Sequence, residues 1–572
     1  MIEGTLEPRR PTAASGAAPG ALTPGAAAVD VLTARKAAWA ALPAAERLAL
    51  LEALIPRVAH VATRWADAAA ELEGLDRRSP LAGEEWLTGP ALALRYLRHL
   101  ARSLRETVAH GRPKLPGRTS ALPGGEVRAP VFPRDTWDRL FFPGVRGEAW
   151  LSPDQSQPSP ESRTRHAGVC LVLGGGNVTA IPVLDALGKL FVDDKVVLLK
   201  LHRLTPFLGP VLSEAFAPLI DAGYLQILPG GDGAGRDLVA LPGVDEVHVT
   251  GSDRTYEAIV FGDGAEGAGR KARGERIFHK PVTAELGNVT PVIVVPGRWS
   301  ARDIALQAEH VASMLTNNAG FNCVAARVVI TPAGWQGRDA FLDGVRAVLA
   351  ATPTRRAWYP GAAERFAAVV DGHPSAERFG EAGDGRLPWA FVTGLDHTRS
   401  DEPSFRTEAF CSAFAETPIA GDSVASYLEA AVRFANDGLW GTLAANLVVH
   451  PSSVRAPGDA AALERAIADL QFGTVAVNYW SAFAFGNGVS PWGAFPGSTS
   501  QDIQSGVGFT HNALMLEGVR KSVIRGPFRP WPKPPYFASH RTLHHLGPDL
   551  ARFEARPSLG AAARLAWSGL RG

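Results

Sequence analysis

The chain has 572 residues, of which 46% are hydrophobic and 20% charged, a balance typical of globular proteins. This length exceeds what one compact core holds, so two or three domains are expected. The formal net charge is +1, from 58 basic and 57 acidic residues, which leaves no overall field to attract nucleic acid or an anionic membrane surface. We therefore expect neither nucleic-acid binding nor membrane binding.

Cysteine content and apolar patterning favour a cytoplasmic protein. The three cysteines, Cys170, Cys323 and Cys411, include no CxxC pair, which argues against a disulfide framework and a structural zinc site. The N-terminus lacks the apolar core of a signal peptide. No uninterrupted run of about 18 apolar residues occurs that would span a membrane. The expectation is a reducing, cytoplasmic location and no bound metal.

The first part of the chain is predicted to be a tail followed by helices. Residues 1–30 are rich in Ala, Pro and Gly without periodicity, which is typical of a disordered tail. From residue 31 to about 110, apolar residues recur at three- and four-residue spacing, which predicts helices. Residues 112–163 are rich in Pro and Gly, and we interpret them as an irregular insertion.

Short apolar runs then alternate with helical patterns. Strands are predicted at 167–173, 195–201, 224–228 and 244–249, and helices at 178–191, 208–220 and 235–241. This alternation predicts a parallel sheet with right-handed crossovers and helices on both faces, a Rossmann-like unit. We place a nucleotide-binding domain at 31–285 and interpret residues 262–276 within it as a flexible surface insertion.

A second α/β region follows at 286–500. It contains four apolar runs that predict strands: PVIVV, ARVVIT, AANLVV and TVAVN. The last segment, 501–572, is rich in Pro and Arg with scattered aromatic residues, and we interpret it as an arm that packs on another subunit. The fold class is therefore α/β, with two sheet-containing domains and a C-terminal segment.

Several short motifs lie in a fixed order along residues 36–520. They are AGVCLVLGGGNVTAIP, KLHRLTP, LPGVDEVHVTGS, ELGN, NNAGFNC, TEAF and SPWGAFPGSTSQDIQSGVGFTHN. In this order and at these separations they resemble the aldehyde dehydrogenase superfamily, as a divergent bacterial-type member. The resemblance implies NAD(P)-dependent oxidation of an aldehyde to a carboxylic acid, and a homodimer or homotetramer.

The resemblance assigns Cys323 as nucleophile and Glu285 as general base. A thiolate that adds to an aldehyde permits hydride loss and leaves a thioester, which water activated by a carboxylate hydrolyses. Cys323 follows a turn-forming stretch, 317–320, where a side chain can be exposed. Partial burial would raise the pKa of Glu285 towards neutrality, which suits a base. The alternatives are an inert buried thiol and a surface carboxylate.

Asn177 matches the side-chain donor to the oxyanion, with the backbone N–H of Cys323 as the second donor. The alternative is that Asn177 only caps the helix that follows it. Gly175 and Gly176 stand where most relatives carry an aromatic residue and a proline. One wall of the site therefore departs from the usual pattern.

The expected cofactor is NAD or NADP. Lys200 matches the lysine that reaches the adenosine ribose, and Arg203 stands where many NAD-preferring members carry a glutamate. A guanidinium pairs with a phosphate, so we predict that NADP is used at least as well as NAD; a solvated surface arginine is the alternative.

Two further motifs are expected to contact the cofactor. Gly251 and Ser252 end a strand and open a helix, where backbone N–H groups bind a pyrophosphate, although Tyr256 replaces a second expected glycine. Glu408 and Phe410 match the pair that positions the nicotinamide ribose and flanks its ring.

Two other functions fit the same motifs. A CoA-acylating aldehyde dehydrogenase would release the thioester to a thiol, but such members usually lack the base that Glu285 supplies. An inactive scaffold of the same fold is the second alternative. The aldehyde itself is not specified; six aromatic residues either line an apolar tunnel or belong to the core. They are Phe321, Tyr479, Trp480, Phe483, Phe485 and Trp492.

Overall fold

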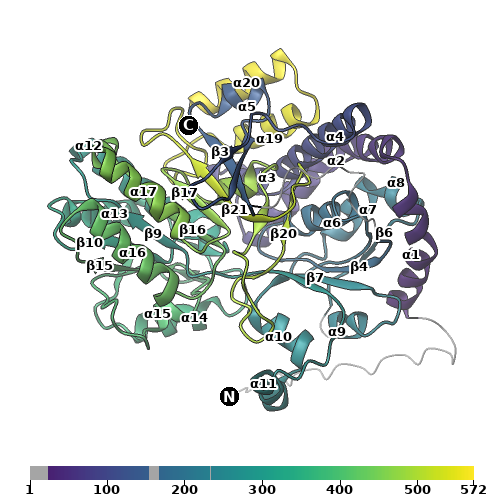
Figure 1. Ribbon diagram of the computed structural model, residues 1–572, viewed down its shortest axis with the longest axis horizontal. Coiled ribbons are helices and arrows are strands. Elements are labelled where there is room, and N and C mark those ends of the chain that lie inside the picture. Colours follow the sequence, from purple (N-terminus) through teal and green to yellow (C-terminus); the bar gives the residue numbers. More distant parts are fainter. Residues whose placement is uncertain (1–22, 154–165, 232–233) are drawn as a thin grey trace, which may run out of the picture.

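The computed structural model describes residues 23–153, 166–231 and 234–572. Two β-sheets organise the fold, and helices pack against both (Figure 1). The predicted α/β class with two sheet-containing parts is confirmed. The predicted tail is wrong at its end, because α1 (Pro24–Ala41) already begins at Pro24. Thr23 caps that helix through its hydroxyl, and proline at the first helical position needs no N–H partner. Residues 1–22 lie outside the described residues.

The smaller sheet has six strands in the order β19-β8-β7-β4-β5-β6, and every pairing except that of β19 is parallel. Its strands are β4 (Val169–Leu173), β5 (Val196–Lys200), β6 (Leu225–Leu228), β7 (Glu246–Gly251), β8 (Val282–Leu286) and β19 (Gly506–Val507). Four of them lie where the sequence predicts strands, because parallel strands buried on both faces are continuous apolar runs. The Rossmann-like unit is therefore confirmed, with β19 added from the C-terminal segment.

Helices follow the strands of this sheet. They are α6 (Ile181–Phe191), α7 (Leu208–Ala215), α8 (Ala217–Asp221), α9 (Ala234–Val239), α10 (Asp253–Phe261) and α11 (Gly264–Arg273). Residues 262–276 are mostly exposed, as a surface insertion would be, but the expectation of a flexible loop is wrong, since α11 occupies most of them. Glycines with left-handed backbone, Gly262 and Gly274, bound the helix, and Glu266 pairs with Arg270 one turn later.

The larger sheet has 11 strands in the order β1-β2-β3-β21-β17-β16-β9-β10-β15-β14-β12. They are β1 (Ser120–Ala121), β2 (Val127–Phe132), β3 (Arg146–Leu151), β9 (Pro291–Val294), β10 (Val328–Pro332), β12 (Glu377–Phe379), β14 (Trp389–Val392), β15 (Ala413–Ile419), β16 (Ala444–Val448), β17 (Thr474–Val477) and β21 (Val519–Arg525). From β21 to β14 all neighbours are parallel, and the pairings at both ends are antiparallel. The four strands predicted in the second α/β region are therefore confirmed.

The helices of this part are α12 (Ala301–Thr316), α13 (Arg338–Ala351), α14 (Ala362–Asp371), α15 (Pro403–Arg406), α16 (Val424–Gly438), α17 (Pro457–Asp469) and α18 (Ala482–Gly486). Two-residue strand pairs complete it: β11 (Arg355–Arg356) with β13 (Arg386–Leu387), and β18 (Trp492–Gly493) with β20 (Phe509–Thr510).

The stretch 112–163 differs from its prediction. Its described part contains β1, β2, α5 (Thr136–Phe141) and β3, so it is not irregular. Strand β3 pairs with β21, and β21 pairs in parallel with β17, so these strands extend the larger sheet and not the nucleotide-binding one. Strands β1, β2 and β3 pair with their neighbours in sequence, but only the distant β21 joins them to the sheet, and their local Pro and Gly content conceals the strand pattern. Residues 154–163 lie outside the described residues.

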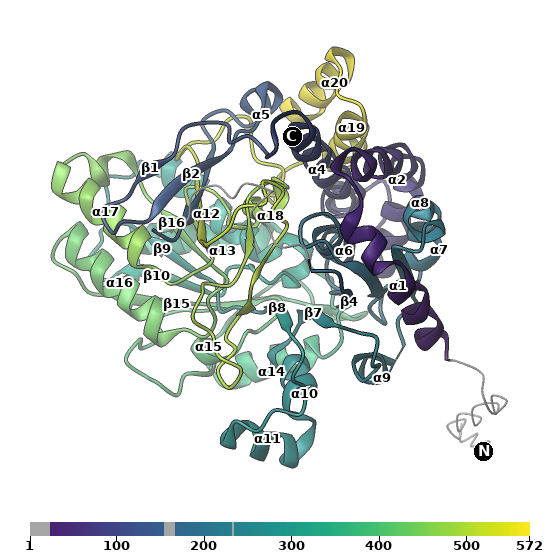
Figure 2. The same ribbon diagram turned by 45° about the vertical axis from the view of Figure 1, so that its right-hand side comes forward.

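Helices from both ends of the chain pack together. They are α2 (Ala44–Glu73), α3 (Gly83–Leu87), α4 (Pro90–His110), α19 (Leu543–Ala555) and α20 (Leu559–Leu570). Both ribbon views place α19 beside α4 and α2 (Figures 1 and 2). The predicted contact of this segment with another subunit stays a prediction.

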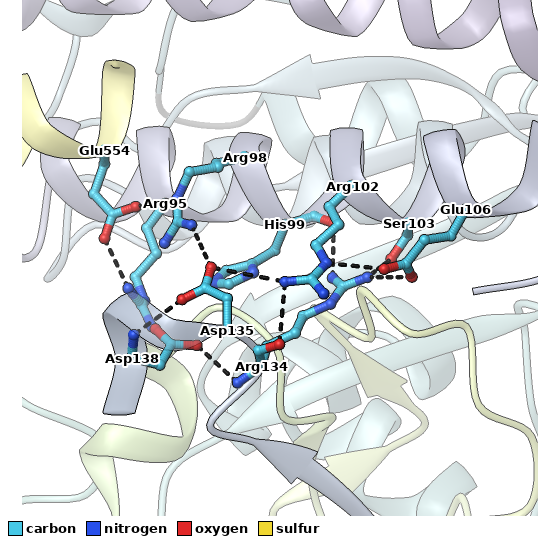
Figure 3. A network of polar contacts seen from close by, with 10 residues as sticks. All are labelled: Arg95, Arg98, His99, Arg102, Ser103, Glu106, Arg134, Asp135, Asp138 and Glu554. Atoms are coloured by element: carbon cyan, nitrogen blue, oxygen red, sulfur yellow. Dashed lines mark hydrogen bonds and ion pairs between the residues drawn. The ribbon is translucent and has the colours of Figure 1, made fainter. Parts of the chain in front are cut away.

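Buried ion pairs fix α19 to α4. Glu554 on α19 accepts from Arg95 at 2.7 Å and from Arg98 at 2.6 Å, both on α4. Arg95 also reaches Asp138 on α5 at 2.7 Å, and Arg98 reaches Asp135 at 2.8 Å (Figure 3). Removing one partner of such a buried pair leaves an uncompensated charge, so the network ties the positions of α4, α5 and α19 to one another.

In the described part of the chain, no helix has both the length and the apolarity to cross a bilayer.

Candidate active site

Four predicted site residues lie at one edge of the smaller sheet. Asn177 follows β4, Lys200 ends β5, Gly251 ends β7 and Glu285 is the penultimate residue of β8. The carboxyl ends of parallel strands share an edge, and ligands of open α/β sheets bind in the crevice outside it. The topology therefore gathers these residues although 108 positions separate the first from the last.

Cys323 lies in the turn between α12 and β10. After α12 the residues Asn318 and Ala319 adopt a left-handed backbone, with φ of 49° and 53°, and Gly320 follows at 81°. Left-handed backbone costs a non-glycine residue about 1–3 kcal/mol, so surrounding contacts must hold this turn. The turn leaves the Cys323 side chain half-buried.

Glu285 is buried and directly adjacent to Cys323. The Cys323 thiol and the Trp492 indole are its polar neighbours, and its Oε1 makes no hydrogen bond with any described residue. Burial, helped by the nearby charge of Asp185, raises the pKa of Glu285 to about 8. A carboxyl group with this pKa exchanges protons near neutral pH, as a general base must.

The thiol needs such a base. Burial and the neighbouring Glu285 and Glu408 raise the pKa of the Cys323 thiol well above its usual range. The thiol is therefore protonated at neutral pH, and only the thiolate is a strong nucleophile. Glu285 is the carboxylate in contact with it, so the arrangement allows the thiol proton to pass to Glu285 as sulfur attacks a carbonyl carbon.

Asn177 faces the same turn. Its amide Nδ2 donates to the carbonyl of Phe321 at 3.1 Å, and Asn318 Nδ2 donates to the Asn177 carbonyl at 2.8 Å. The second hydrogen of the Asn177 amide is not used in that bond. The helix-cap alternative is wrong, because α6 begins at Ile181 with Ala180 at its cap position.

The glycine pair beside Asn177 makes room for another side chain. A Cβ on Gly176 would lie 2.1 Å from Nδ1 of His202. The His202 ring stacks on Tyr359, with ring centres 6.1 Å apart and planes 19° apart. Burial and the charges of Lys200 and Arg203 lower the pKa of His202 to about 4, so the ring is neutral. A histidine and a tyrosine thus form the wall that Gly176 opens.

The predicted adenosine contacts lie near this wall. Lys200 is half-buried at the end of β5, and Gly235 of α9 is a near neighbour, since its Cβ position is 3.8 Å from Lys200 Cε. Arg203 is exposed three residues later. Both cations therefore lie beyond the carboxyl end of β5, where a nucleotide would cross the edge of the sheet.

Gly251 and Ser252 lie where β7 meets α10. Ser252 is the N-cap of α10, and its hydroxyl accepts from the Thr255 N–H at 3.2 Å. Both residues are exposed, so the amino end of α10 and its positive dipole face outwards. Tyr256, in place of the expected glycine, is buried in α10.

Glu408 and Phe410 lie in the loop that leads into β15. The Glu408 carboxylate is in contact with Gly287 and accepts from the backbone N–H of Asn288. Burial raises the pKa of Glu408 to about 7, and its Oε1 has no hydrogen-bond partner among the described residues. Phe410 packs edge-on against Tyr359 with ring centres 5.0 Å apart.

The six aromatic residues considered for a tunnel do not form one group. Phe321 packs with Trp358, Tyr359 and Phe410, whereas Tyr479 packs against Phe483. A separate contact joins Phe485 to Trp492. Only Phe483 and Phe485 are half-buried and the others are buried, which favours the core interpretation.

A polar cluster behind Glu285 has no counterpart in the sequence predictions. Asp185 on α6 accepts from the Thr250 hydroxyl at 2.7 Å and contacts His511 Nε2 at 2.9 Å, and His248 lies 3.5 Å away. Although burial opposes it, these histidines hold the pKa of Asp185 well below its usual range. The one sequence feature that could have indicated this cluster is Asp185 itself, an acidic residue in the apolar pattern of α6.

Within the described ranges, no group of three or more His, Cys, Asp or Glu side chains is arranged to hold a metal ion.

A profile of the aldehyde dehydrogenase family matches residues 153–357. The fold resembles NADP-dependent glyceraldehyde-3-phosphate dehydrogenase from Bacillus halodurans, solved with NADP, with a TM-score of 0.58 and 16% identity over 87% of this chain and 90% of that one. It resembles an aldehyde dehydrogenase from Mycobacterium tuberculosis, solved with NAD+, with a TM-score of 0.57 and 18% identity over 89% and 91%. By this profile match and by its fold, the chain resembles the aldehyde dehydrogenase superfamily.

The similarity to curated aldehyde dehydrogenases is distant. N-succinylglutamate 5-semialdehyde dehydrogenase from Novosphingobium aromaticivorans is 26% identical over 296 residues, 49% of this chain and 57% of that protein. Matches to other curated relatives cover 30% and 40% of their length. The predicted aldehyde dehydrogenase-like fold is confirmed, and distant similarity to curated aldehyde dehydrogenases supports the predicted family.

Proposed function

We propose that the protein oxidises an aldehyde to the carboxylic acid with NAD or NADP, through a thioester on Cys323. The observation that carries the proposal is the contact between the Cys323 thiol and the buried Glu285 carboxylate, whose pKa is about 8. A nucleophile next to a base whose pKa lies near the working pH is what covalent catalysis at a carbonyl requires.

The residues at the sheet edge fit a dinucleotide. Gly287 lacks a side chain and so admits the Glu408 carboxylate, whose Oε1 is left for a hydroxyl donor such as a ribose. The open amino end of α10 at Ser252 suits a pyrophosphate. Lys200 and Arg203 would face the adenosine end, and Arg203 suits a 2′-phosphate, so NADP is expected to serve at least as well as NAD. The structural relatives solved with NADP and with NAD+ are consistent with either choice.

The side chains then have distinct tasks. Cys323 sulfur bonds to the aldehyde carbon while its proton passes to Glu285, and Asn177 and the Cys323 N–H hold the oxyanion of the thiohemiacetal. NAD or NADP, when bound, would supply the hydride acceptor, so that loss of a hydride (two electrons and one proton) from the thiohemiacetal carbon would leave the thioester on Cys323. Glu285 releases the thiol proton to solvent and then takes a proton from a water molecule as the water oxygen attacks the thioester carbon. The carbon–sulfur bond breaks, the proton on Glu285 passes to the sulfur, and the acid leaves with the Cys323 thiol regenerated.

A panel of aldehydes with each cofactor, followed by the absorbance of reduced nicotinamide, tests the proposal. Cys323→Ala is expected to abolish turnover, and Glu285→Gln to lower it at least about a hundredfold. Accumulated acyl-enzyme on Cys323 in Glu285→Gln, detected by intact mass, would show that the base acts in hydrolysis. Turnover that survives loss of the sulfur would exclude the mechanism, and an acyl-CoA product on addition of CoA would replace hydrolysis with thiol release.

A further inference from the structure

Glu84 on α3 reaches the strained turn before Cys323. Its Oε2 accepts a hydrogen bond from the backbone N–H of Asn318, with the two atoms 3.0 Å apart. Asn318 is the first of the left-handed residues in that turn, and a buried backbone N–H requires an acceptor. A side chain 234 positions away in the sequence therefore satisfies the turn that carries the nucleophile.

A single arginine holds this carboxylate in place. Arg355 on β11 donates to Glu84 Oε2 at 2.6 Å and to Glu73 Oε2 at 2.8 Å. All three residues are buried, and so is Glu85, which contacts Glu73. Burial, together with the charge of the neighbouring Glu73, raises the pKa of Glu85 well above its usual range. We name Glu73, Glu84, Glu85 and Arg355 the brace.

The same segment also contacts the loop of Asn177. The carbonyl of Thr88, next to α3, accepts from the Ala180 N–H at 3.0 Å. Trp65 on α2 donates its indole N–H to the Thr179 hydroxyl at 2.9 Å. The N-terminal helices and the residue that follows α3 thus make hydrogen bonds to both loops of the proposed active site, one loop from each sheet, and none of these three bonds involves a reacting atom.

We propose that Glu84 and Arg355 are positioning residues that place the Cys323 sulfur between Glu285 and Asn177. The proposal rests on the proposed role of Cys323 as nucleophile. Without the Glu84 acceptor, the Asn318 turn loses its partner and relaxes to a less strained backbone, which carries Cys323 away from Glu285. Because the reacting atoms must be held within a fraction of an ångström, a shift of about 1 Å costs roughly a hundredfold in rate.

A purely structural role for the brace is the competing explanation, and the chain offers a matched control. Glu554 is also a buried carboxylate bonded by arginines, Arg95 and Arg98 (Figure 3). In the described chain it has no hydrogen bond to either loop of the site. Glu554→Leu should therefore destabilise the protein as Glu84→Leu does, without displacing Cys323.

The test compares Glu84→Leu, Glu84→Gln, Arg355→Met and Glu554→Leu in the full-length protein. The pH profile of Cys323 alkylation by iodoacetamide, read by peptide mass spectrometry well below the unfolding temperature, reports the surroundings of the thiol. In Glu84→Leu and Arg355→Met its midpoint is expected to move to lower pH, because the thiol leaves Glu285. In parallel, kcat should fall at least about tenfold while KM changes little. Glu84→Gln keeps an oxygen acceptor for Asn318 and should recover most of both losses, and Glu554→Leu should leave both unchanged.

The outcomes separate this proposal from the proposed function. An unmoved alkylation midpoint in folded Glu84→Leu and Arg355→Met overturns the brace, whether or not aldehydes are oxidised. A moved midpoint in a protein that oxidises no aldehyde supports the brace and overturns the function. If Glu84→Leu does not fold, Arg355→Lys, which keeps the charge but cannot bond both carboxylates with a planar fork, should show the same shift. An unmoved alkylation midpoint in Arg355→Lys would also overturn the proposal.

Discussion

The Glu408 carboxylate occupies the space that a side chain at Gly287 would fill: a Cβ on Gly287 would lie 1.9 Å from Glu408 Oε2. Gly287→Ala should therefore displace Glu408 and weaken the grip on the nicotinamide ribose. We expect KM for the cofactor to rise at least about tenfold, since a lost hydrogen bond to a charged group is worth roughly 1.5–3 kcal/mol. Initial rates at varied cofactor concentration measure the change.

A second glycine-to-alanine substitution, at a site without close neighbours, shows whether the rise in cofactor KM is specific to Gly287. A Cβ on Gly334 would meet nothing within 4 Å, so Gly334→Ala should leave the cofactor KM unchanged. Equal KM values in both variants and the wild type would show that Glu408 does not contact the cofactor.

Local patterns predicted the nucleotide-binding sheet well. Strand β5, for example, matches the apolar run KVVLLKL, because a strand buried on both faces needs apolar residues at every position. Strand β21 joins β17 to β3 and was not predicted. Its sequence, VRKSVIR, places three cations in a strand, and the buried Lys521 is accommodated because it bonds three carbonyls at the end of α17. A contact of that kind leaves no local pattern.

In the candidate site, too, local sequence motifs predicted some features and distant contacts determine others. Cys323, Glu285 and Asn177 were found through motifs, and the structure places them together. The contacts that hold them were not found, because Glu84 bonds Asn318 and Arg355 from distant parts of the chain. The only local signal was a pair of glutamates, Glu84 and Glu85, ahead of an apolar helix, and such a pair is also typical of an exposed first turn.

The raised pKa of Glu285 predicts how activity depends on pH. A base with a pKa of about 8 is mostly protonated at pH 6.5 and mostly ionised at pH 9. The rate of thioester hydrolysis should therefore rise about tenfold per pH unit below that pKa and level off above it. A pH profile of kcat in a mixed buffer of constant ionic strength measures this. A flat profile between pH 6 and 9 would show that another step or another base limits turnover.

Removal of this carboxyl should stabilise the fold in alkaline solution. The folded-state pKa of Glu285 is about 8, above the value of about 4.3 for an unfolded chain, so the folded protein binds the extra proton. Stability from the neutral form is complete below the unfolded pKa and is lost as the pH rises to about 8. Glu285→Gln should therefore raise Tm by several degrees at pH 8 and little at pH 4.5. Differential scanning calorimetry at both pH values tests the sign, and a Tm gain that is larger in acid would contradict it.

Arg203 is expected to set the choice of cofactor. Arg203→Glu should lower kcat/KM for NADP at least about tenfold, because a carboxylate repels the 2′-phosphate, and leave that for NAD equal or higher. The measurement is kcat/KM for both cofactors in both proteins at two salt concentrations, since an exposed charge is screened by salt. A wild-type preference for NAD of tenfold or more would rule out this role.

Glu554 should contribute to stability without contributing to chemistry. Its carboxylate is fully buried between Arg95 and Arg98, and Glu554→Leu leaves two guanidinium groups short of a partner. Breaking a buried pair from one side costs about 3–5 kcal/mol, so urea unfolding should begin at clearly lower concentration. Replacing Arg95→Met, Arg98→Met and Glu554→Leu together should recover part of this loss, because no guanidinium group is then left short of the Glu554 carboxylate, although Asp138 and Asp135 each lose one arginine. If the triple variant is less stable than Glu554→Leu, then Asp135 and Asp138, which lose their own arginines, carry more of the network's stability than Glu554 does.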